Sequence, residues 1–207
     1  MPAAREALLD AALRALADRP WRAVRMVDVA ALAGVSRQTL YNEFGTKHGL
    51  ATALLRRAAD RYLTGVDRAL TAPAPERPAA VARWTVRASR ADPLVKGLLT
   101  GLWGEWLPRP GHEVPAPAQL LGLARDRMVA ASDPTTATGE AATRGTATGD
   151  EARGGTAAGE AATQETATGE EARRRTAAEA TAMRCETALR LALSYVVVPC
   201  PTGSRAL

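Results

Sequence analysis

A short run of polar side chains near the start of the chain has the chemistry of a surface that binds nucleic acid. It holds hydroxyl, guanidinium, amide and phenol groups at Ser36, Arg37, Gln38, Thr39, Tyr41 and Asn42. Guanidinium and amide groups form hydrogen bonds with base edges in the major groove of DNA, and hydroxyl groups bind phosphate oxygens. A short helix that exposes this set fits the major groove, which is about 12 Å wide.

Two short helices are expected to position this polar run. The pattern of apolar residues predicts one helix from about 26 to 33 and a second from about 37 to 43. Gly34 between them accepts a left-handed backbone without a steric penalty. Ser36 is a preferred residue at a helix N-cap. A helix, a glycine turn and a second helix form the helix-turn-helix signature.

Helices are also expected on both sides of this pair. The first apolar stripe consists of Leu8, Leu9, Ala12, Leu13 and Leu16, and it predicts a helix that ends before Pro20. Thr46 is placed to cap a long helix. The stripe on that helix consists of Leu50, Leu54, Ala58, Tyr62 and Val66.

The rest of the chain also has helical patterning. Helices are predicted over about 79–91, 93–102, 118–131 and 178–197, with proline-rich loops between several of them. None of these segments has the strict alternation of a half-buried strand. The predicted fold class is therefore all-α.

Residues 138–177 differ in kind, because they form four tandem ten-residue units. These 40 residues contain no Val, Ile, Leu, Met, Phe, Trp, Tyr or Cys, so little apolar burial offsets the entropy of ordering. A glycine in each unit also disfavours helix by about 1 kcal/mol relative to alanine. We predict a disordered low-complexity insertion over 134–177; a functional spacer is the alternative.

Between about Ala7 and Leu54 the chain resembles the TetR family of bacterial transcriptional regulators, most closely in the stretch AGVSRQTLYNEFGTKHGL. The resemblance implies an all-α homodimer that binds double-stranded operator DNA. The implied division is a helix-turn-helix domain (1–46), a connecting helix (47–70), and a larger ligand-sensing and dimerisation domain (79–133 and 178–198). The implied DNA contacts are Ser36, Arg37, Gln38, Thr39, Tyr41 and Asn42, with Lys47 as a phosphate-binding lysine.

The same resemblance implies a ligand-responsive repressor of a near-palindromic operator. Its small-molecule effector would bind in the C-terminal domain, where the candidate pocket residues are Trp84, Trp103, Trp106 and Met128; ordinary core packing is the alternative for these side chains.

The chain departs from the family pattern at two places. Arg25 occupies a position where the family usually has a capping threonine, and the last family helix is expected to be missing after Pro199. The alternative function is therefore a truncated or dimerisation-defective DNA-binding protein without a working effector response.

Composition excludes several other classes of protein. The formal net charge is +5, and residues 1–68 hold 11 basic against 7 acidic side chains, which locates an anionic partner there. Two cysteines do not make a disulfide framework, so a reduced cytoplasmic setting is expected. No apolar run approaches the roughly 20 residues of a membrane span, and the start of the chain lacks the apolar core of a secretory signal.

No sequence pattern points to an enzyme. The chain lacks a phosphate-cradling glycine loop and the HExxH and GxSxG motifs, so we expect no catalytic residues and no cofactor. His48 and His112 have no partner ligands at metal spacing and are predicted to lie on the surface, with no metal site. Cys185 and Cys200 are predicted to be inert rather than redox-sensing.

Overall fold

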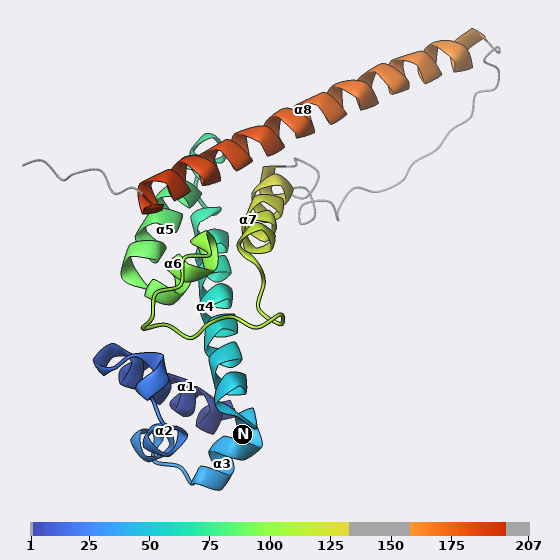
Figure 1. Cartoon of the computed structure of the whole chain (residues 1–207). Coiled ribbons are helices and arrows are strands. Elements are labelled where there is room, and N and C mark those ends of the chain that lie inside the picture. The colour runs from blue at the N-terminus through green and yellow to red at the C-terminus, as the bar shows by residue number, and fades with distance from the viewer. Residues whose placement is uncertain (1, 133–157, 198–207) are drawn as a thin grey trace, which may run out of the picture.

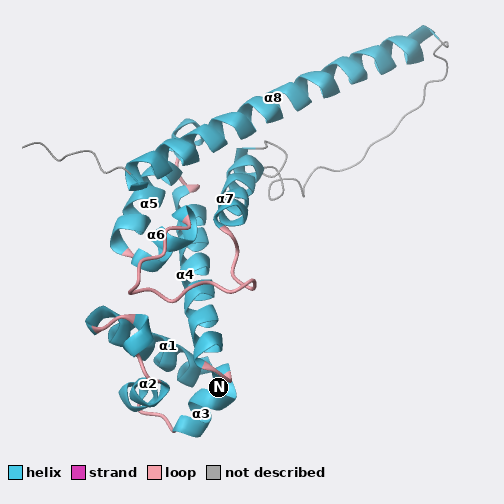
Figure 2. Cartoon of the chain, viewed as in Figure 1, coloured by secondary structure: helices cyan, strands magenta, loops and turns pink. Residues whose placement is uncertain are grey.

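The computed structural model describes residues 2–132 and 158–197, and in these ranges every regular element is a helix (Figures 1 and 2). The prediction of an all-α fold is confirmed for this part of the chain. The elements are α1 (Pro2–Asp18), η1 (Trp21–Ala23), α2 (Met26–Ala33), α3 (Arg37–Phe44), α4 (Lys47–Ala69), η2 (Ala74–Glu76), α5 (Arg77–Ala91), α6 (Pro93–Thr100), α7 (Pro117–Ser132) and α8 (Ala158–Val197).

The first three helices and the start of α4 enclose a small apolar core. Its buried residues are Leu8, Leu9, Ala11, Ala12, Ala15, Val24, Val29, Ala30, Leu40, Phe44, Leu50, Ala53 and Leu54. Small alanines on α1 and α2 let these helices approach closely, and leucines from α3 and α4 fill the remaining space. This core fixes the position of α3 on its inner side.

Helix α4 connects this core to a second one. Its residues Leu50 and Leu54 belong to the first core, whereas Ala58, Tyr62 and Val66 belong to the second. All five are buried, as the predicted stripe requires. Thr46 caps the helix, since its hydroxyl oxygen accepts a hydrogen bond from the backbone N–H of Gly49 at 3.0 Å. Figure 1 shows α4 running from the N-terminal helices to the opposite half of the molecule.

The second core lies among α4, α5, α6, α7 and the C-terminal part of α8. It contains one buried polar pair, in which the hydroxyl groups of Tyr62 and Thr85 lie 3.0 Å apart. Burial raises the pKa of the Tyr62 phenol. The indole N–H of Trp84 donates to the backbone carbonyl of Tyr62 at 3.0 Å, which ties α5 to α4.

Helix α8 begins 20 residues earlier than the sequence predicted. The expectation of disorder over 134–177 is wrong for 158–177, which are helical, while residues 133–157 lie outside the described residues. The physical reason is cooperativity: the end of α8 is anchored by the buried residues Cys185, Leu189, Ala192 and Val196. Once a helix is nucleated, each further residue adds a hydrogen bond, and an Ala- and Glu-rich sequence favours this extension despite its glycines.

Candidate nucleic-acid interface

The turn between α2 and α3 has the backbone geometry that its sequence predicts. Gly34 adopts the left-handed conformation, with φ 68° and ψ 28°. Its N–H donates to the carbonyl of Ala31 at 3.1 Å, and the N–H of Val35 donates to the carbonyl of Ala30 at 3.1 Å. These bonds satisfy carbonyls at the end of α2 and turn the chain sharply into α3.

Ser36 caps the start of α3. Its hydroxyl oxygen accepts a hydrogen bond from the backbone N–H of Thr39 at 3.0 Å, and the two hydroxyl oxygens lie 2.8 Å apart. The cap predicted at Ser36 is confirmed. It satisfies one of the N–H groups that a helix start leaves without an intrahelical partner, so the first turn of α3 is held in place.

The two faces of α3 differ in burial. Leu40 and Phe44 face the N-terminal core and are buried. Arg37, Gln38 and Asn42 are exposed, as is Tyr41, which is 48% accessible. The amide of Gln38 donates to the amide oxygen of Asn42 at 2.7 Å, which holds these two side chains together on the outer face.

Lys47 lies at the start of α4, next to α3. Its ammonium nitrogen donates to the backbone carbonyl of Arg22 at 3.1 Å and lies 5.4 Å from the centroid of the Trp21 ring. Partial burial lowers the pKa of this ammonium. An ammonium has three N–H donors, so the bond with Arg22 leaves two for a phosphate oxygen.

The structure therefore brings one group of predicted contacts together. Arg37, Gln38, Tyr41 and Asn42 lie on the exposed face of one helix, whereas Ser36 and Thr39 pair with each other at its start. Lys47 is turned toward η1. Figure 1 shows α3 at the end of the molecule opposite to α8, away from the second core. An exposed helix with a guanidinium and two amides on its surface has the form that enters a major groove.

Comparison with known proteins identifies the first part of the chain. A sequence profile described as "Bacterial regulatory proteins, tetR family" matches residues 8–54. This range contains α2, the Gly34 turn and α3. Over these residues the chain is similar to the TetR family.

Several transcriptional regulators are similar to the chain over part of their length. The chain is 44% identical to the HTH-type transcriptional regulator AlkX of Mycobacterium tuberculosis over 101 residues, which cover 47% of this chain and 48% of AlkX. It is 36% identical to the regulator BetI of Rhizobium meliloti over 94 residues, covering 44% and 46%. The transcriptional activator FasR of Mycolicibacterium smegmatis is 41% identical over 63 residues, covering 30% and 29%. The matched part of the chain thus spans about half the length of these relatives, or less.

Among solved structures, the TetR-family repressor AlkX of Dietzia sp. covers 95% of this chain and 85% of its own, with 19% identity and a TM-score of 0.46.

Arg25 lies at the N-cap position of α2, where the resemblance to the TetR family predicts a capping threonine, and the structure shows what stands in its place. Arg25 makes no side-chain cap. Its guanidinium instead donates two hydrogen bonds of 3.0 Å to the carboxylate of Asp28, in the first turn of α2. The hydrogen bond from Arg25 is the largest influence that lowers the pKa of Asp28, and the nearby charge of Arg19 adds to it. A carboxylate in the first turn favours the helix through the helix dipole.

Ion pairs tie α1 to α4 and α3. Arg57 on α4 is only 12% exposed in its side chain, and its guanidinium lies 3.0 Å from Glu6 and 2.8 Å from Asp10 on α1. Arg5 on α1 lies 3.6 Å from the carboxylate of Glu43 on α3, and its guanidinium lies 4.8 Å from the centroid of the Phe44 ring. The sequence did not predict these contacts. The sequence feature that could have predicted the contact with Arg57 is the pair of carboxylates, Glu6 and Asp10, one helical turn apart on α1.

The loop between α6 and α7 also contacts the N-terminal helices, a link that the sequence did not predict. The backbone N–H of Trp21 donates to the backbone carbonyl of Trp106 at 2.8 Å. Arg56 on α4 donates to the backbone carbonyl of Glu113 at 3.2 Å and pairs with its carboxylate at 3.4 Å. We call residues 101–116 the connecting loop, because it joins the second core to the N-terminal helices.

The four predicted pocket residues do not surround one described cavity. Met128 is 1% exposed and belongs to the second core, and Trp84 packs against that core from α5. Trp103 lies against Gly97 of α6, and Trp106 is 54% exposed on the connecting loop. Trp103 lines a small cavity beside Pro93 and Lys96, which none of the other three residues lines.

The described residues hold neither a metal-binding cluster nor a membrane-spanning helix. Within them, no group of three or more His, Cys, Asp and Glu side chains is arranged to hold a metal ion. His48 and His112 are both exposed. Among the described helices, none combines the length and the apolar character needed to cross a bilayer.

Proposed function

We propose that this protein is a ligand-responsive transcriptional repressor that binds a near-palindromic operator as a homodimer. The observation that carries the proposal is the exposed polar face of α3. The cap at Ser36 and the buried Leu40 and Phe44 hold that face rigidly, so Arg37 and Gln38 enter a groove without a large ordering cost.

DNA contact divides into base readout and phosphate binding. Arg37, Gln38 and Asn42 are assigned to base edges, because guanidinium and amide groups make the paired hydrogen bonds that distinguish bases. Tyr41, the hydroxyls of Ser36 and Thr39, and Lys47 are assigned to the backbone of the DNA. In a homodimer the two copies of α3 would enter successive major grooves, about 34–36 Å apart.

The phosphate assignment is tested with the only two lysines of the chain, Lys47 and Lys96. Fluorescence anisotropy measures binding of the full chain to its own upstream DNA at several salt concentrations. Lys47→Ala is expected to weaken binding to all sequences alike and to reduce the slope of log affinity against log salt by about 1. Lys96→Ala, on α6, is the control and should leave the slope unchanged. An unaltered slope in Lys47→Ala would remove Lys47 from the phosphate contacts.

The exposed side of α8 supports the homodimer. Met183 is 72% exposed and Val197 is 51% exposed, and their spacing of close to four helical turns puts both on one side of the helix. Large exposed apolar side chains that share a helix face are typical of an interaction surface.

Sedimentation velocity tests the dimer. The full chain should be dimeric at micromolar concentration, and Met183→Glu should shift it toward monomer. Leu123→Glu, at an exposed leucine on α7, is the matched control. A wild-type monomer at this concentration would favour the alternative, a DNA-binding protein that has lost dimerisation.

The connecting loop supports a response to an effector. A ligand bound between the helices that follow α4 would act on operator affinity only if it favoured one of two conformations. The contacts from Trp106 to Trp21 and from Glu113 to Arg56 offer a route, since a shift of the loop would move η1 and α4 relative to α3. Disruption of the loop contact by Glu113→Ala is expected to change the effector response while leaving binding of the unliganded protein to operator within about twofold.

A further inference from the structure

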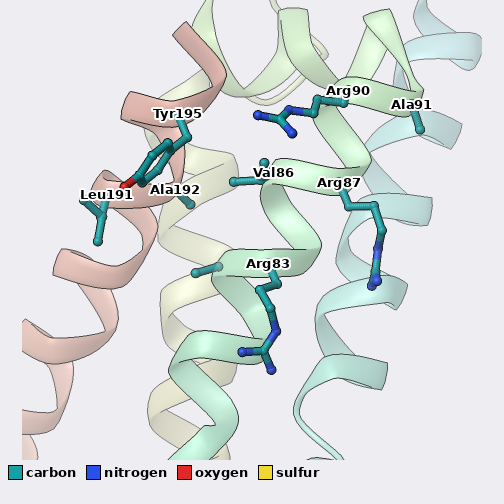
Figure 3. Close-up of a pocket in the computed structure, with 9 residues that line it drawn as sticks. Arg83, Val86, Arg87, Arg90, Ala91, Leu191, Ala192 and Tyr195 are labelled. Carbon is teal, nitrogen blue, oxygen red and sulfur yellow. The ribbon is translucent and has the colours of Figure 1, made fainter. Parts of the chain in front are cut away.

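An open groove of about 710 Å³ runs between α5 and α8 (Figure 3). Its lining residues are Ala82, Arg83, Val86, Arg87, Arg90, Ala91, Leu191, Ala192 and Tyr195. This volume is within the range of about 300–1,000 Å³ that is typical of small-molecule sites. The candidate pocket residues predicted from the sequence do not line it, and neither Met183 nor Val197 does so.

The floor of the groove is apolar. Val86 and Ala82 contribute methyl groups from α5, and Ala192 contributes one from α8. Leu191 and the ring of Tyr195 form the wall on the side of α8, where both are exposed in this chain. Figure 3 shows Leu191 and Tyr195 on the α8 side of the groove and Val86 on the α5 side. Apolar surface of this kind gains free energy when an aliphatic group covers it.

The charged groups on the rim are all cations. Arg83, Arg87 and Arg90 follow one another along α5, and the lining includes no Asp or Glu. Arg87 lies 5.6 Å from the centroid of the Trp84 ring, so a cation–π contact already engages it. In Figure 3 the guanidinium of Arg90 extends from α5 toward α8, whereas Arg87 points away from α8. Arg90 is thus the cation best placed for a ligand in the groove.

Charge complementarity indicates which kind of molecule binds in the groove between α5 and α8. A second copy of this chain, packed groove to groove around a two-fold axis, would bring the same arginines toward each other, which costs free energy. The sequence after Val197 contains one Arg and no Asp or Glu, so it offers no complementary side chain either. The groove instead suits a molecule that has both an aliphatic part and an anionic end.

We infer that the groove between α5 and α8 binds a small amphipathic anion, with its carboxylate on the guanidinium of Arg90 and its aliphatic chain over Val86 and Ala192. A guanidinium binds a carboxylate through two parallel hydrogen bonds, which no neutral headgroup reproduces. Arg83 lies seven residues before Arg90, or about 10 Å along the helix, so one carboxylate cannot contact both. Arg83 adds a weaker, longer-range attraction.

Isothermal titration calorimetry of the full chain tests this inference with three probes, with dodecanoate kept below its critical micelle concentration and dodecan-1-ol below its solubility limit. Dodecanoate has the chain and the charge, dodecan-1-ol has the chain alone, and acetate has the charge alone. Dodecanoate should bind with a stoichiometry of one per chain and at least about tenfold more tightly than dodecan-1-ol, because only it makes the charge-assisted pair. Acetate should show no measurable heat of binding.

Variants locate the site. Arg90→Gln should remove most of the advantage of dodecanoate over dodecan-1-ol, and Val86→Glu should weaken dodecanoate by more than tenfold by placing a like charge in the floor. Arg83→Gln should have a smaller effect than Arg90→Gln. Arg61→Gln, an exposed arginine on α4 outside the groove, is the control and should leave both affinities unchanged.

Equal affinity for dodecanoate and dodecan-1-ol would overturn the inference, and so would dodecanoate binding that Arg90→Gln and Val86→Glu leave intact. Absence of dodecanoate binding, together with a changed dimer affinity in Val86→Glu, would assign the groove to protein association instead. The binding inference does not rest on operator recognition, since the calorimetric experiment contains no DNA. A chain that failed to bind an operator would still be expected to bind dodecanoate.

Discussion

Gly34 allows a sharp test of the turn that orients α3. A Cβ added there would meet no atom within 4 Å, so steric contact with the rest of the protein adds nothing to the cost of Gly34→Ala. The cost comes from the left-handed backbone, at about 1–2 kcal/mol, and is partly offset because alanine restricts the unfolded chain. We expect a net loss of about 1 kcal/mol, or roughly 2–4 °C in the midpoint of thermal unfolding for a chain of this size.

The same substitution at Gly122 should have the opposite sign. Gly122 lies within α7 and also has open space around the position of a Cβ, but its backbone is helical. Gly122→Ala should therefore stabilise the protein by about 0.5–1 kcal/mol. Thermal unfolding followed by circular dichroism compares the two variants, and Gly34→Asn should cost less than Gly34→Ala. If Gly34→Ala raised the midpoint as Gly122→Ala does, the left-handed turn would be refuted.

Three further predictions concern stability and are read from urea unfolding curves. Ser36→Ala should cost about 1 kcal/mol, while Ser36→Asp should retain the cap and most of the stability; equal losses would show that the cap does not form. Gly65→Ala should cost about 1–3 kcal/mol and alter the fluorescence of Trp84, because the new methyl group would overlap the indole ring. Arg57→Met should cost about 1 kcal/mol, because it removes a mostly buried guanidinium that pairs with two carboxylates on α1, whereas Arg56→Met, which removes a pair exposed on both sides, should cost less. The reverse order would contradict the assignment of the α1–α4 contact to Arg57.

The helix-turn-helix could be predicted in detail because local chemistry determines it. The glycine at position 34 and the hydroxyls at positions 36 and 46 act on the backbone within four residues of themselves, so their roles are visible in the sequence. The buried and exposed faces of α3 follow from helical periodicity in the same way. For this part of the chain, the positions of the elements agree with the prediction to within one residue.

Contacts between distant segments could not be predicted. The bond between Trp21 and Trp106 joins backbone atoms, so no side-chain type marks it. The ammonium of Lys47 also donates to a backbone carbonyl, that of Arg22. Because every residue has such a carbonyl, the residue type at position 22 does not reveal the contact. The four bulky residues proposed for a pocket were grouped by size alone, and size does not say which side of a helix bundle a residue faces. The groove between α5 and α8 became visible only when two helices far apart in sequence were placed side by side.

The central claim, that α3 reads DNA sequence, is tested most directly by the ratio of two affinities at physiological salt. Fluorescence anisotropy would compare the upstream DNA of the protein's own gene with a scrambled duplex of equal length and composition. The account predicts that the wild-type chain prefers the upstream DNA by a factor of about a thousand or more. The double variant Arg37→Ala/Gln38→Ala should lose most of this preference while keeping its affinity for the scrambled duplex to within about tenfold. Equal affinity of the wild-type chain for both duplexes, or a preference that survives the double substitution, would contradict it.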